Sequence, residues 1–448
     1  MRYLRLILIM EMMFILLSGC AYHHEGGAWP HRRPLANNLG SYKSYQLLST
    51  FADSSVPSER LGTIDLHQAL SLALMHHPEL AGFAYQVRSA EARALQAGMM
   101  PNPEMEIEIE EISDIGFKDA ITSFLLSQSI ELGGKRKKRA RVAHLEADAA
   151  RWEYEMVRLH VYTRAKKAFH DVVAAQEKVK FAAEMTGLSE QMLKTVSARV
   201  EAGRDSPIEK ARAITSLASA EIEQRRAESE LVTAKISLAA QWGGSASSFD
   251  DALGDLDILK PVPSLDELSE RLSRNPDVAR WDTAIEQSQT ALNLERATRI
   301  PDLALGAGLE YSNVERETTY RLGLAFPIPL FDRNQGGLLE AQSNLLKAEK
   351  ERDAAVVGIL AELTEAFQKL TSSYDEAAVL RGDVLPAAER ALEGIHDGFN
   401  RGKYSYLEVI DTQRTMFELK SQYIEALIRY HLARADIERL IAESLDEG

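Results

Sequence analysis

The chain has 448 residues with 52 basic and 67 acidic side chains, which give a formal net charge of −15. That balance argues against nucleic acid as a partner and suits a secreted protein with a charged surface. Cys20 is the sole cysteine, so disulfides and thiolate metal clusters within one chain are excluded. Beyond residue 20 no apolar run reaches the roughly 18 residues of a membrane helix, so any membrane-embedded part has to consist of strands.

The first 20 residues are typical of an export signal that ends at a lipid-modified cysteine. Two arginines precede an apolar stretch from residue 6 to 17, which is too short to span a membrane as a mature helix, and Ser18-Gly19 places small residues before Cys20. This pattern resembles the bacterial lipoprotein signal, which predicts removal of residues 1–19, acylation of Cys20 and a lipidated tail over residues 20–62. Because Glu11 interrupts the apolar stretch, an ordinary signal peptide and a buried apolar segment are the alternatives.

The rest of the chain repeats itself at a spacing of about 200 residues. Three pairs of matching positions show the repeat, with offsets of 198, 200 and 199 residues: His77-Pro78-Glu79 with Asn275-Pro276-Asp277, Pro101 with Pro301, and Gly203 with Gly402. Each half has the same order of short helix, β-hairpin, very long helix, glycine turn and returning helix. The first repeat is expected to span residues 63–242 and the second residues 265–446, with a linker at 243–264.

Runs that alternate with a period of two residues predict β-hairpins at 101–131 and 301–329. Each run is about as long as a tilted transmembrane strand. The expected lipid-facing residues are Met105, Ile107, Leu305 and Leu324, and those facing the lumen or the loops are Glu106, Glu108 and Arg321. A sheet half buried in a soluble domain is the alternative. Since open sheet edges are not tolerated in lipid, membrane insertion would require several chains to pool their hairpins.

Long stretches with little proline predict helices over residues 135–202, 207–242, 335–400 and 404–445. Apolar residues spaced by three and four predict narrow coiled-coil seams, namely Leu145, Ala149, Trp152, Met156 and Leu159 in the first half and Leu360, Leu363, Phe367 and Leu370 in the second. Gly187 and Pro386 occupy equivalent positions in the two repeats. They predict that both long helices change course at the same level.

Several motifs carry a family resemblance over residues 63–445. The Asn/His-Pro-Glu/Asp helix starts, the Pro101-Asn102-Pro103-Glu104 string and Tyr406-Leu407-Glu408-Val409-Ile410-Asp411 after Gly402 resemble the TolC-type outer membrane efflux proteins. The string Ser129-Ile130-Glu131-Leu132-Gly133-Gly134-Lys135-Arg136 resembles the CzcC-like branch, which serves heavy-metal cation efflux. The resemblance implies a mainly α-helical fold with a membrane β part. In a homotrimer of this kind, two β-hairpins per chain form a shared outer-membrane barrel, and long antiparallel helices form a periplasmic tunnel.

The function implied by the resemblance is the exit duct of a tripartite efflux pump. The chain would be a lipid-anchored channel in the outer membrane that exports heavy-metal cations together with a periplasmic adaptor protein and an inner-membrane RND transporter. Contact with the adaptor is expected at the turns Gly203-Arg204 and Gly402-Lys403. The alternatives are a drug or other small-molecule duct of the same family, and a periplasmic adaptor or coiled-coil scaffold.

Two acidic residues after the second glycine turn are candidate gate residues. Glu408 and Asp411 follow Gly402 by six and nine residues, which places them on one face of the returning helix. The same offsets after Gly203 give Glu209 and Arg212. In the family that the chain resembles, such positions line or latch the narrow periplasmic end of the tunnel, so we expect a gate here with an anionic ring of Glu408 and Asp411. Ordinary solvated charges near a helix N-terminus are the alternative.

Catalytic chemistry has no support in the sequence. Gly-x-Ser-x-Gly, His-Glu-x-x-His and glycine-rich dinucleotide motifs do not occur, so we expect neither enzyme activity nor a cofactor. His23, His24 and His31 in the N-terminal tail could bind a soft cation, but histidines without fixed geometry are more often linker residues. No metal site is predicted.

Acylation of Cys20 is open to a direct test. Cys20→Ser removes the thiol that would carry the lipid, so it is expected to abolish palmitate labelling and slow maturation. Mass spectrometry of the mature wild-type protein should begin at an acylated Cys20. Peptides from residues 1–19 on the mature protein would contradict the lipoprotein interpretation.

Overall fold

The computed structural model describes residues 62–112, 116–244 and 249–445. Cys20, the predicted tail and its histidines therefore lie outside the described residues, as does part of the loop between the strands of the first hairpin. The described residues form two compact units, each built from separate stretches of the chain. Unit 1 contains residues 85–152 and 280–353, and unit 2 contains the remainder.

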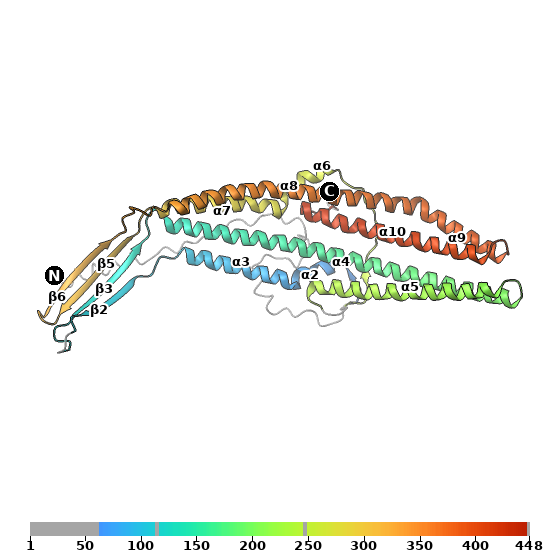
Figure 1. The fold of residues 1–448 in the computed structure, drawn as a ribbon, viewed down its shortest axis with the longest axis horizontal. Helices are drawn as coiled ribbons and strands as arrows, with labels where there is room; N and C mark the ends of the chain where they lie inside the picture. The colour runs from blue at the N-terminus through green and yellow to red at the C-terminus, as the bar shows by residue number, and fades with distance from the viewer. Residues whose placement is uncertain (1–61, 113–115, 245–248, 446–448) are drawn as a thin grey trace. The chain divides into compact units, whose positions relative to one another are not determined.

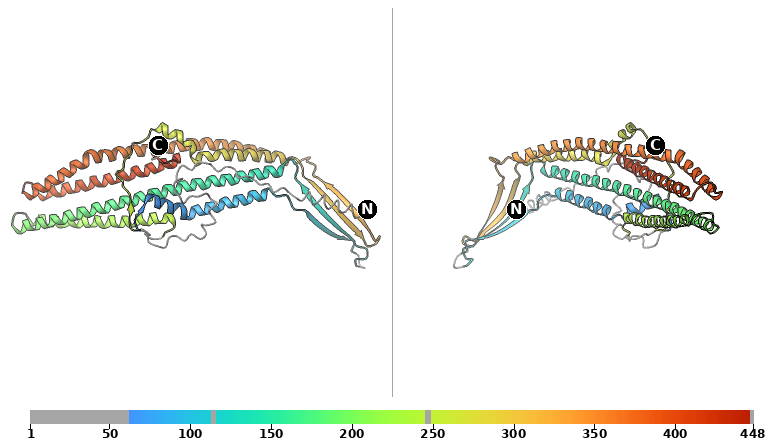
Figure 2. Two further views of the ribbon diagram at one scale, coloured as in Figure 1. Left: turned by 180° about the vertical axis from the view of Figure 1, so that it is seen from behind. Right: turned by 45° about the vertical axis from the view of Figure 1, so that its right-hand side comes forward.

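Unit 1 contains a four-stranded antiparallel sheet in the order β2-β3-β5-β6 (Figure 1; Figure 2). The strands are β2 (Glu104–Glu110), β3 (Ile121–Ile130), β5 (Leu303–Ser312) and β6 (Glu317–Ala325). Each repeat contributes one hairpin, and β3 pairs with β5 from Ile121 opposite Ser312 to Ile130 opposite Leu303. The central strand pair therefore joins the two halves of the duplication.

Ion pairs attach the ends of the strands to the start of the long helix α4 (Lys135–Glu201). The buried Lys135 ammonium lies 2.6 Å from a carboxylate oxygen of Asp302 and donates to the carbonyl of Ile300 at 2.8 Å. Arg139 forms a two-pronged pair with Glu131, in which Nη2 donates to Oε2 at 3.0 Å. Such bidentate pairs fix orientation as well as distance.

Four helices of the described chain take part in unit 1 or cross into unit 2. They are α3 (Pro78–Ala97), α7 (Pro276–Thr298), α8 (Gln335–Val379) and, as noted, α4. Unit 2 adds α2 (Leu66–His76), α5 (Pro207–Ala239), α6 (Leu265–Arg271), α9 (Leu385–Asn400) and α10 (Tyr406–Ile441). No helix among the described residues is both long and apolar enough to cross a membrane.

The main core of unit 2 includes residues from the segment between the repeats. Phe249 and Leu256 are buried with Trp242 and Phe169. In the same segment β4 (Ala252–Leu253) pairs in parallel with β1 (Ile64–Asp65). The sequence predicted only a linker at 243–264. The strand β4 was not predicted, because its pairing and burial depend on residues far away in the chain.

Two details of the long helices differ from the sequence-based expectation. α4 is one helix through Gly187, whereas a π-helical turn (Leu380–Val384) separates α8 from α9 just before Pro386. The matched break is therefore found only in the second repeat, where the turn accommodates a proline without an N–H. In the seam of α8, Leu360 is 45% exposed, and Ile359 is buried in its place with Leu363 and Leu370.

Unit 2 also buries a polar cluster between α4 and α10. The Lys166 ammonium lies 2.5 Å from a carboxylate oxygen of Glu438, which is 1% exposed and also faces Arg434. The rings of His170 and His431 stack with centroids 4.5 Å apart, and the His431 Nε2 lies 2.9 Å from the Leu256 carbonyl oxygen. Because burial penalises the imidazolium, and His431, Lys166 and Arg434 add repulsion, the pKa of His170 falls to about 3.

The neutral state of His170 predicts a pH-dependent stability. In the unfolded chain a histidine titrates near pH 6.5, whereas folded His170 stays neutral down to about pH 3. Below pH 6.5 protonation therefore favours the unfolded state, and the free energy of unfolding falls by about 1.4 kcal/mol per pH unit until the pH reaches about 3. His170→Phe keeps a ring against His431 and removes one titrating group, so the apparent Tm should fall less steeply between pH 6.5 and 4. The exposed His67 provides a control, since His67→Gln should retain the wild-type slope. Identical slopes for all three proteins would contradict this assignment.

Candidate functional site: an amphipathic sheet and the helix-turn end

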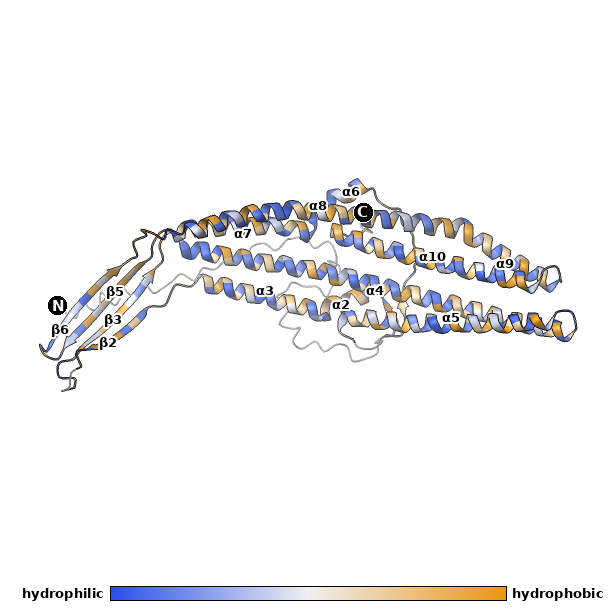
Figure 3. Ribbon diagram, in the orientation of Figure 1, coloured by the Kyte–Doolittle hydropathy of each residue, from blue (hydrophilic) through white to orange (hydrophobic). Residues whose placement is uncertain are grey.

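The sheet of unit 1 has one apolar and one mainly polar face. Directly paired residues of antiparallel strands point to the same side, and the register pairs Ile107 with Phe124, Phe124 with Leu309 and Leu309 with Tyr320. The same face carries Met105, Ile109, Leu126, Leu305, Tyr311, Leu322 and Leu324. The strands correspondingly carry hydrophobic and hydrophilic residues in alternation (Figure 3). The opposite face holds the glutamates of β2, the serines of β3 and the ion pair of Arg321 with Glu310, although Leu125 also lies there.

The apolar face is exposed in the described chain. Exposed fractions reach 70% for Met105, 77% for Tyr320 and 89% for Leu322. An apolar sheet surface of this kind marks contact with a membrane or another protein. β2 and β6 also lie at the two edges of the sheet, each with one side lacking a strand partner in the described chain. Within the described chain the sheet thus lacks a cover for its apolar face and partners for its edge strands.

In unit 2 the two hairpins of helices end in the same kind of turn. Gly203 between α4 and α5 and Gly402 between α9 and α10 have φ values of 69° and 76°, a left-handed conformation that glycine adopts without strain. In each turn the glycine N–H bonds to the carbonyl three residues back, and the next N–H, of Arg204 or Lys403, bonds to the carbonyl five residues back. Both turns are Schellman motifs, as expected for glycines that end helices.

The side chains around the two turns differ. In the first, Arg199 pairs with both carboxylate oxygens of Asp205 at 2.7 and 3.0 Å. The positions 199 residues later are Gly398 and Tyr404, where the Tyr404 ring fills the space that a Cβ on Gly398 would need. The duplication has therefore kept the backbone turn and exchanged an ion pair for aromatic packing.

Arg199 also links the two hairpins to each other. Its Nη1 donates to the carbonyl oxygen of Phe399 at 2.8 Å, and its guanidinium carbon lies 4.5 Å from the centre of the Phe399 ring. Phe399 is buried with Tyr406 and Val409 against Met192 and Val196. This end of unit 2 thus has a small core of its own.

The candidate gate residues lie near the starts of two helices, Glu408 and Asp411 on an exposed face of α10 and Glu209 and Arg212 on α5. Ser405 donates from its backbone N–H to Glu408 at 2.7 Å and from its hydroxyl at 2.9 Å, and these two bonds hold the pKa of Glu408 below its usual range. Asp411 is exposed, and no ion pair to it is found within the described residues. In the first repeat Glu209 and Arg212 pair with each other at 3.1 Å. The second repeat therefore presents more uncompensated negative charge, while the role of all four residues as a gate stays a prediction.

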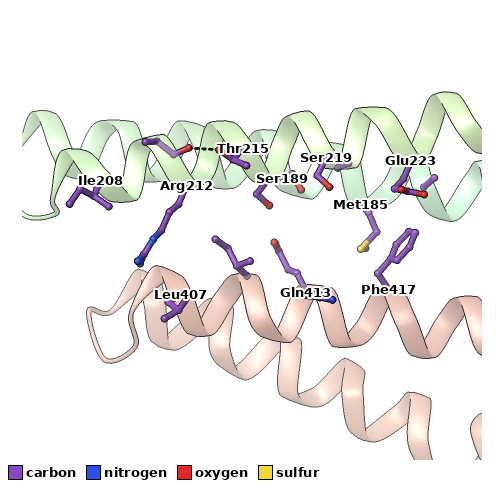
Figure 4. Close-up of a pocket in the computed structure, with 16 residues that line it drawn as sticks. Met185, Ser189, Ile208, Arg212, Thr215, Ser219, Glu223, Leu407, Gln413 and Phe417 are labelled. Carbon is purple, nitrogen blue, oxygen red and sulfur yellow. Dashed lines mark hydrogen bonds between the residues drawn. The ribbon is translucent and has the colours of Figure 1, made fainter.

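A groove of about 600 Å³ lies beside these residues, between the α4/α5 hairpin and α10 (Figure 4). Ile208 and Arg212 of α5 and Leu407 and Phe417 of α10 are among its lining residues. Arg212 and Gln413 point towards each other's helices across the groove in Figure 4. Sequence patterns gave no signal for this groove, because the residues come from three helices.

Comparison with known proteins identifies the family. The pattern of the family described as outer membrane efflux protein matches residues 69–244 and 268–443. The chain belongs to this family. The two matched segments confirm the internal duplication and the fold class predicted from the sequence, and they place the protein in the outer membrane.

Individual relatives cover most of the chain. The cobalt-zinc-cadmium resistance protein CzcC of Cupriavidus metallidurans is 33% identical over 86% of this chain and 91% of its own length. The pyoverdine export outer membrane protein OpmQ of Pseudomonas aeruginosa is 25% identical over 94% of this chain and 93% of its own. A crystal structure of CusC, described in terms of transmembrane channel formation, matches with a TM-score of 0.74 at 16% identity and covers 95% of this chain and all of that chain. This last likeness shows a shared fold.

The two faces of the sheet predict unequal costs for an added positive charge. Ile107→Lys places an ammonium on the apolar face, and Glu106→Lys places one on the polar face of the same strand. If the apolar face meets lipid, the first change should cost about 2 to 4 kcal/mol near the bilayer midplane, and the second should cost much less. Folding into lipid vesicles, followed by denaturant titration, measures the difference. Equal costs would contradict the assignment of the faces.

The gate prediction can be tested without disturbing the helix start. Glu408 belongs to a capping box with Ser405, and since glutamine also fits that motif, Glu408→Gln with Asp411→Asn removes the charges and keeps the cap. The double variant should raise single-channel conductance in lipid bilayers and weaken block by trivalent cations. Glu418→Gln, further along the exposed side of α10, is the control. Unchanged conductance and block in a trimeric double variant would remove Glu408 and Asp411 from the gate.

Proposed function

We propose that the protein is the outer-membrane exit duct of a tripartite efflux pump that exports heavy-metal cations. Membership of the outer membrane efflux protein family supports the class of function. The name of CzcC, the relative at 33% identity, supports divalent cobalt, zinc and cadmium as the class of substrate. An inner-membrane RND transporter would supply the energy and select the substrate, and a periplasmic adaptor would connect the two membranes.

The sheet of unit 1 is the observation that carries the proposal. It exposes an apolar face, and among the described residues each edge strand has a partner on one side only. In a bilayer each unsatisfied backbone group costs several kcal/mol, so an open sheet cannot remain in lipid. Three chains with four strands each would close into a single barrel of twelve strands. A homotrimer satisfies the edges and places every apolar face towards lipid.

The helices then provide the periplasmic part of the duct. The turns Gly203-Arg204 and Gly402-Lys403 would contact the adaptor, and three copies of Glu408 and Asp411 would surround one axis at the narrow end. Carboxylates in such a ring attract cations through their summed field. The duct is proposed to be passive, with no catalytic role.

An organic substrate is the alternative within the family, supported by the likeness to OpmQ, whose name refers to pyoverdine export. A periplasmic scaffold is less compatible with the structure, because a water-soluble scaffold would leave the apolar face of the sheet in contact with solvent.

Three measurements test the proposal. Native mass spectrometry should give a trimer, and the trimer should form cation-selective channels in planar bilayers, as judged from the reversal potential in a salt gradient. Deletion of the gene in its own host should lower tolerance to zinc, cobalt or cadmium and leave tolerance to organic toxins unchanged. The wild-type gene should restore tolerance. Loss of tolerance to organic compounds alone would favour the small-molecule duct, and a soluble monomer without channel activity would favour the scaffold.

A further inference from the structure

A basic groove of about 510 Å³ lies in unit 1 at the junction of strands and helices. It is formed by the start of α4, the end of α7 and the loops beside β3 and β5. The lining residues that matter here are Lys137, Lys138, Arg141, Asn293, Arg296 and Ile300. No acidic residue lines the groove. This is unusual for a chain with a net charge of −15.

Two neighbouring cations of the same segment are neutralised by carboxylates, whereas most cations of the groove are not. Lys135 pairs with Asp302, and Arg139 pairs with Glu131, so both have a structural task at the strand ends. Of the groove cations, Arg141 alone pairs with a carboxylate of the described chain, that of Glu286 at 2.5 Å.

The other groove cations contact neutral groups or solvent. Lys138 donates to the carbonyl of Gly133 at 2.7 Å, and Arg296 donates to the amide oxygen of Asn293 at 3.2 Å. Lys137 is exposed. In the described chain no carboxylate forms an ion pair with Lys137, Lys138 or Arg296. The groove therefore gathers three uncompensated positive charges, from two helices distant in sequence, whose mutual repulsion a bound anion would relieve.

The groove lies close to the boundary of the apolar face. Gly133 follows the end of β3 at Ile130 by three residues, and Ile300 precedes the start of β5 at Leu303 by three. Ile130 and Leu303 are paired. Three extended residues span about 10 Å at most. A headgroup layer is about 5 to 8 Å thick on each side of the hydrocarbon, so an apolar face immersed in lipid brings the groove to the depth of the phosphates.

Exposed apolar side chains near the strand ends favour a lipid over a soluble anion. Ile300 is 44% exposed at the groove itself, and Leu132 in the adjoining loop is 39% exposed. In the segment between β6 and α8, Leu330 and Phe331 are 63% and 91% exposed, beside Arg299 and Arg333. A free phosphate ion has no apolar part that could contact this surface, whereas the glycerol and upper acyl region of a lipid would cover it.

We propose that this groove binds the phosphate of an anionic glycerophospholipid in the periplasmic leaflet of the outer membrane. The cations of α4 and α7 contact the phosphate, and the apolar residues at the strand ends contact the lipid below it. The bound headgroup fixes the depth at which the sheet passes into the helices. This inference rests on the proposed membrane-spanning function.

The experiment uses the full-length trimer in detergent with added phosphatidylglycerol or zwitterionic phosphatidylcholine, followed by native mass spectrometry. The test variant combines Lys137→Gln, Lys138→Gln and Arg296→Gln. The control variant combines Lys347→Gln, Lys350→Gln and Arg352→Gln, which removes the same charge from exposed positions of α8 in the same unit. A third variant, with Lys137→Arg, Lys138→Arg and Arg296→Lys, keeps the charge of the groove.

Wild type, control and charge-preserving variant should bind phosphatidylglycerol in preference to phosphatidylcholine. The test variant should bind phosphatidylglycerol about 100-fold more weakly, since each basic residue contributes about 1 kcal/mol near an anionic surface. Equal losses in test and control variants would overturn the site. Displacement of the lipid by millimolar inorganic phosphate would also overturn it, in favour of a soluble anion. Bilayer conductance of the same preparations separates the two hypotheses: channels without selective lipid binding contradict only the lipid site, and absence of channels contradicts the proposed duct.

Discussion

The unsatisfied edges of one four-stranded sheet are the constraint on which the rest of the structure depends. Within the described residues, β2 and β6 each lack a strand partner on one side, and the apolar face of the sheet is exposed. Folding of the membrane part is therefore inseparable from assembly. If three chains combine their hairpins in one barrel, α4 and α8 follow the threefold symmetry of that barrel, because a short loop attaches each helix to its strand. At the start of α4, Lys135 and Arg139 reinforce that attachment with buried or bidentate ion pairs.

The chain consists of two repeats with the same order of helices and strands, but the side chains at equivalent positions of the two repeats differ. Both helix turns retain the left-handed glycine and the same two hydrogen bonds. Around them, an arginine–aspartate pair in one repeat corresponds to a glycine and a tyrosine ring in the other. The backbone itself differs in the long helices, since α4 is continuous whereas a π-helical turn separates α8 from α9. Backbone geometry is thus the same in the two repeats at the glycine turns, where side chains differ, and it differs at the π-helical turn.

Local patterns in the sequence were sufficient for the long helices, the hairpins and the two faces of the sheet, whereas the fold class came from the resemblance to the TolC-type efflux proteins. Alternation along β2 assigns Ile107 and Glu106 to opposite sides whatever the partner strand is. The pairing of Ile130 with Leu303 could not be read in the same way, because it joins residues more than 170 positions apart. The burial of Ile359 in place of Leu360 depends on small rotations of a helix that its spacing alone does not fix. Similarly, the basic run Lys-Arg-Lys-Lys-Arg at 135–139 is plain in the sequence, but only tertiary contacts distinguish Lys135, which pairs with Asp302, from Lys137, which has no ion pair within the described residues.

The difference between the two glycine turns has a consequence for stoichiometry. A trimer would present six turns around its axis, but they would be of two kinds in alternation, so the ring would have threefold rather than sixfold symmetry. A partner that recognises the Arg199–Asp205 turn alone would bind in three copies per channel. One that occupies all six turns would need two distinct modes of contact, even if its own subunits were identical in sequence.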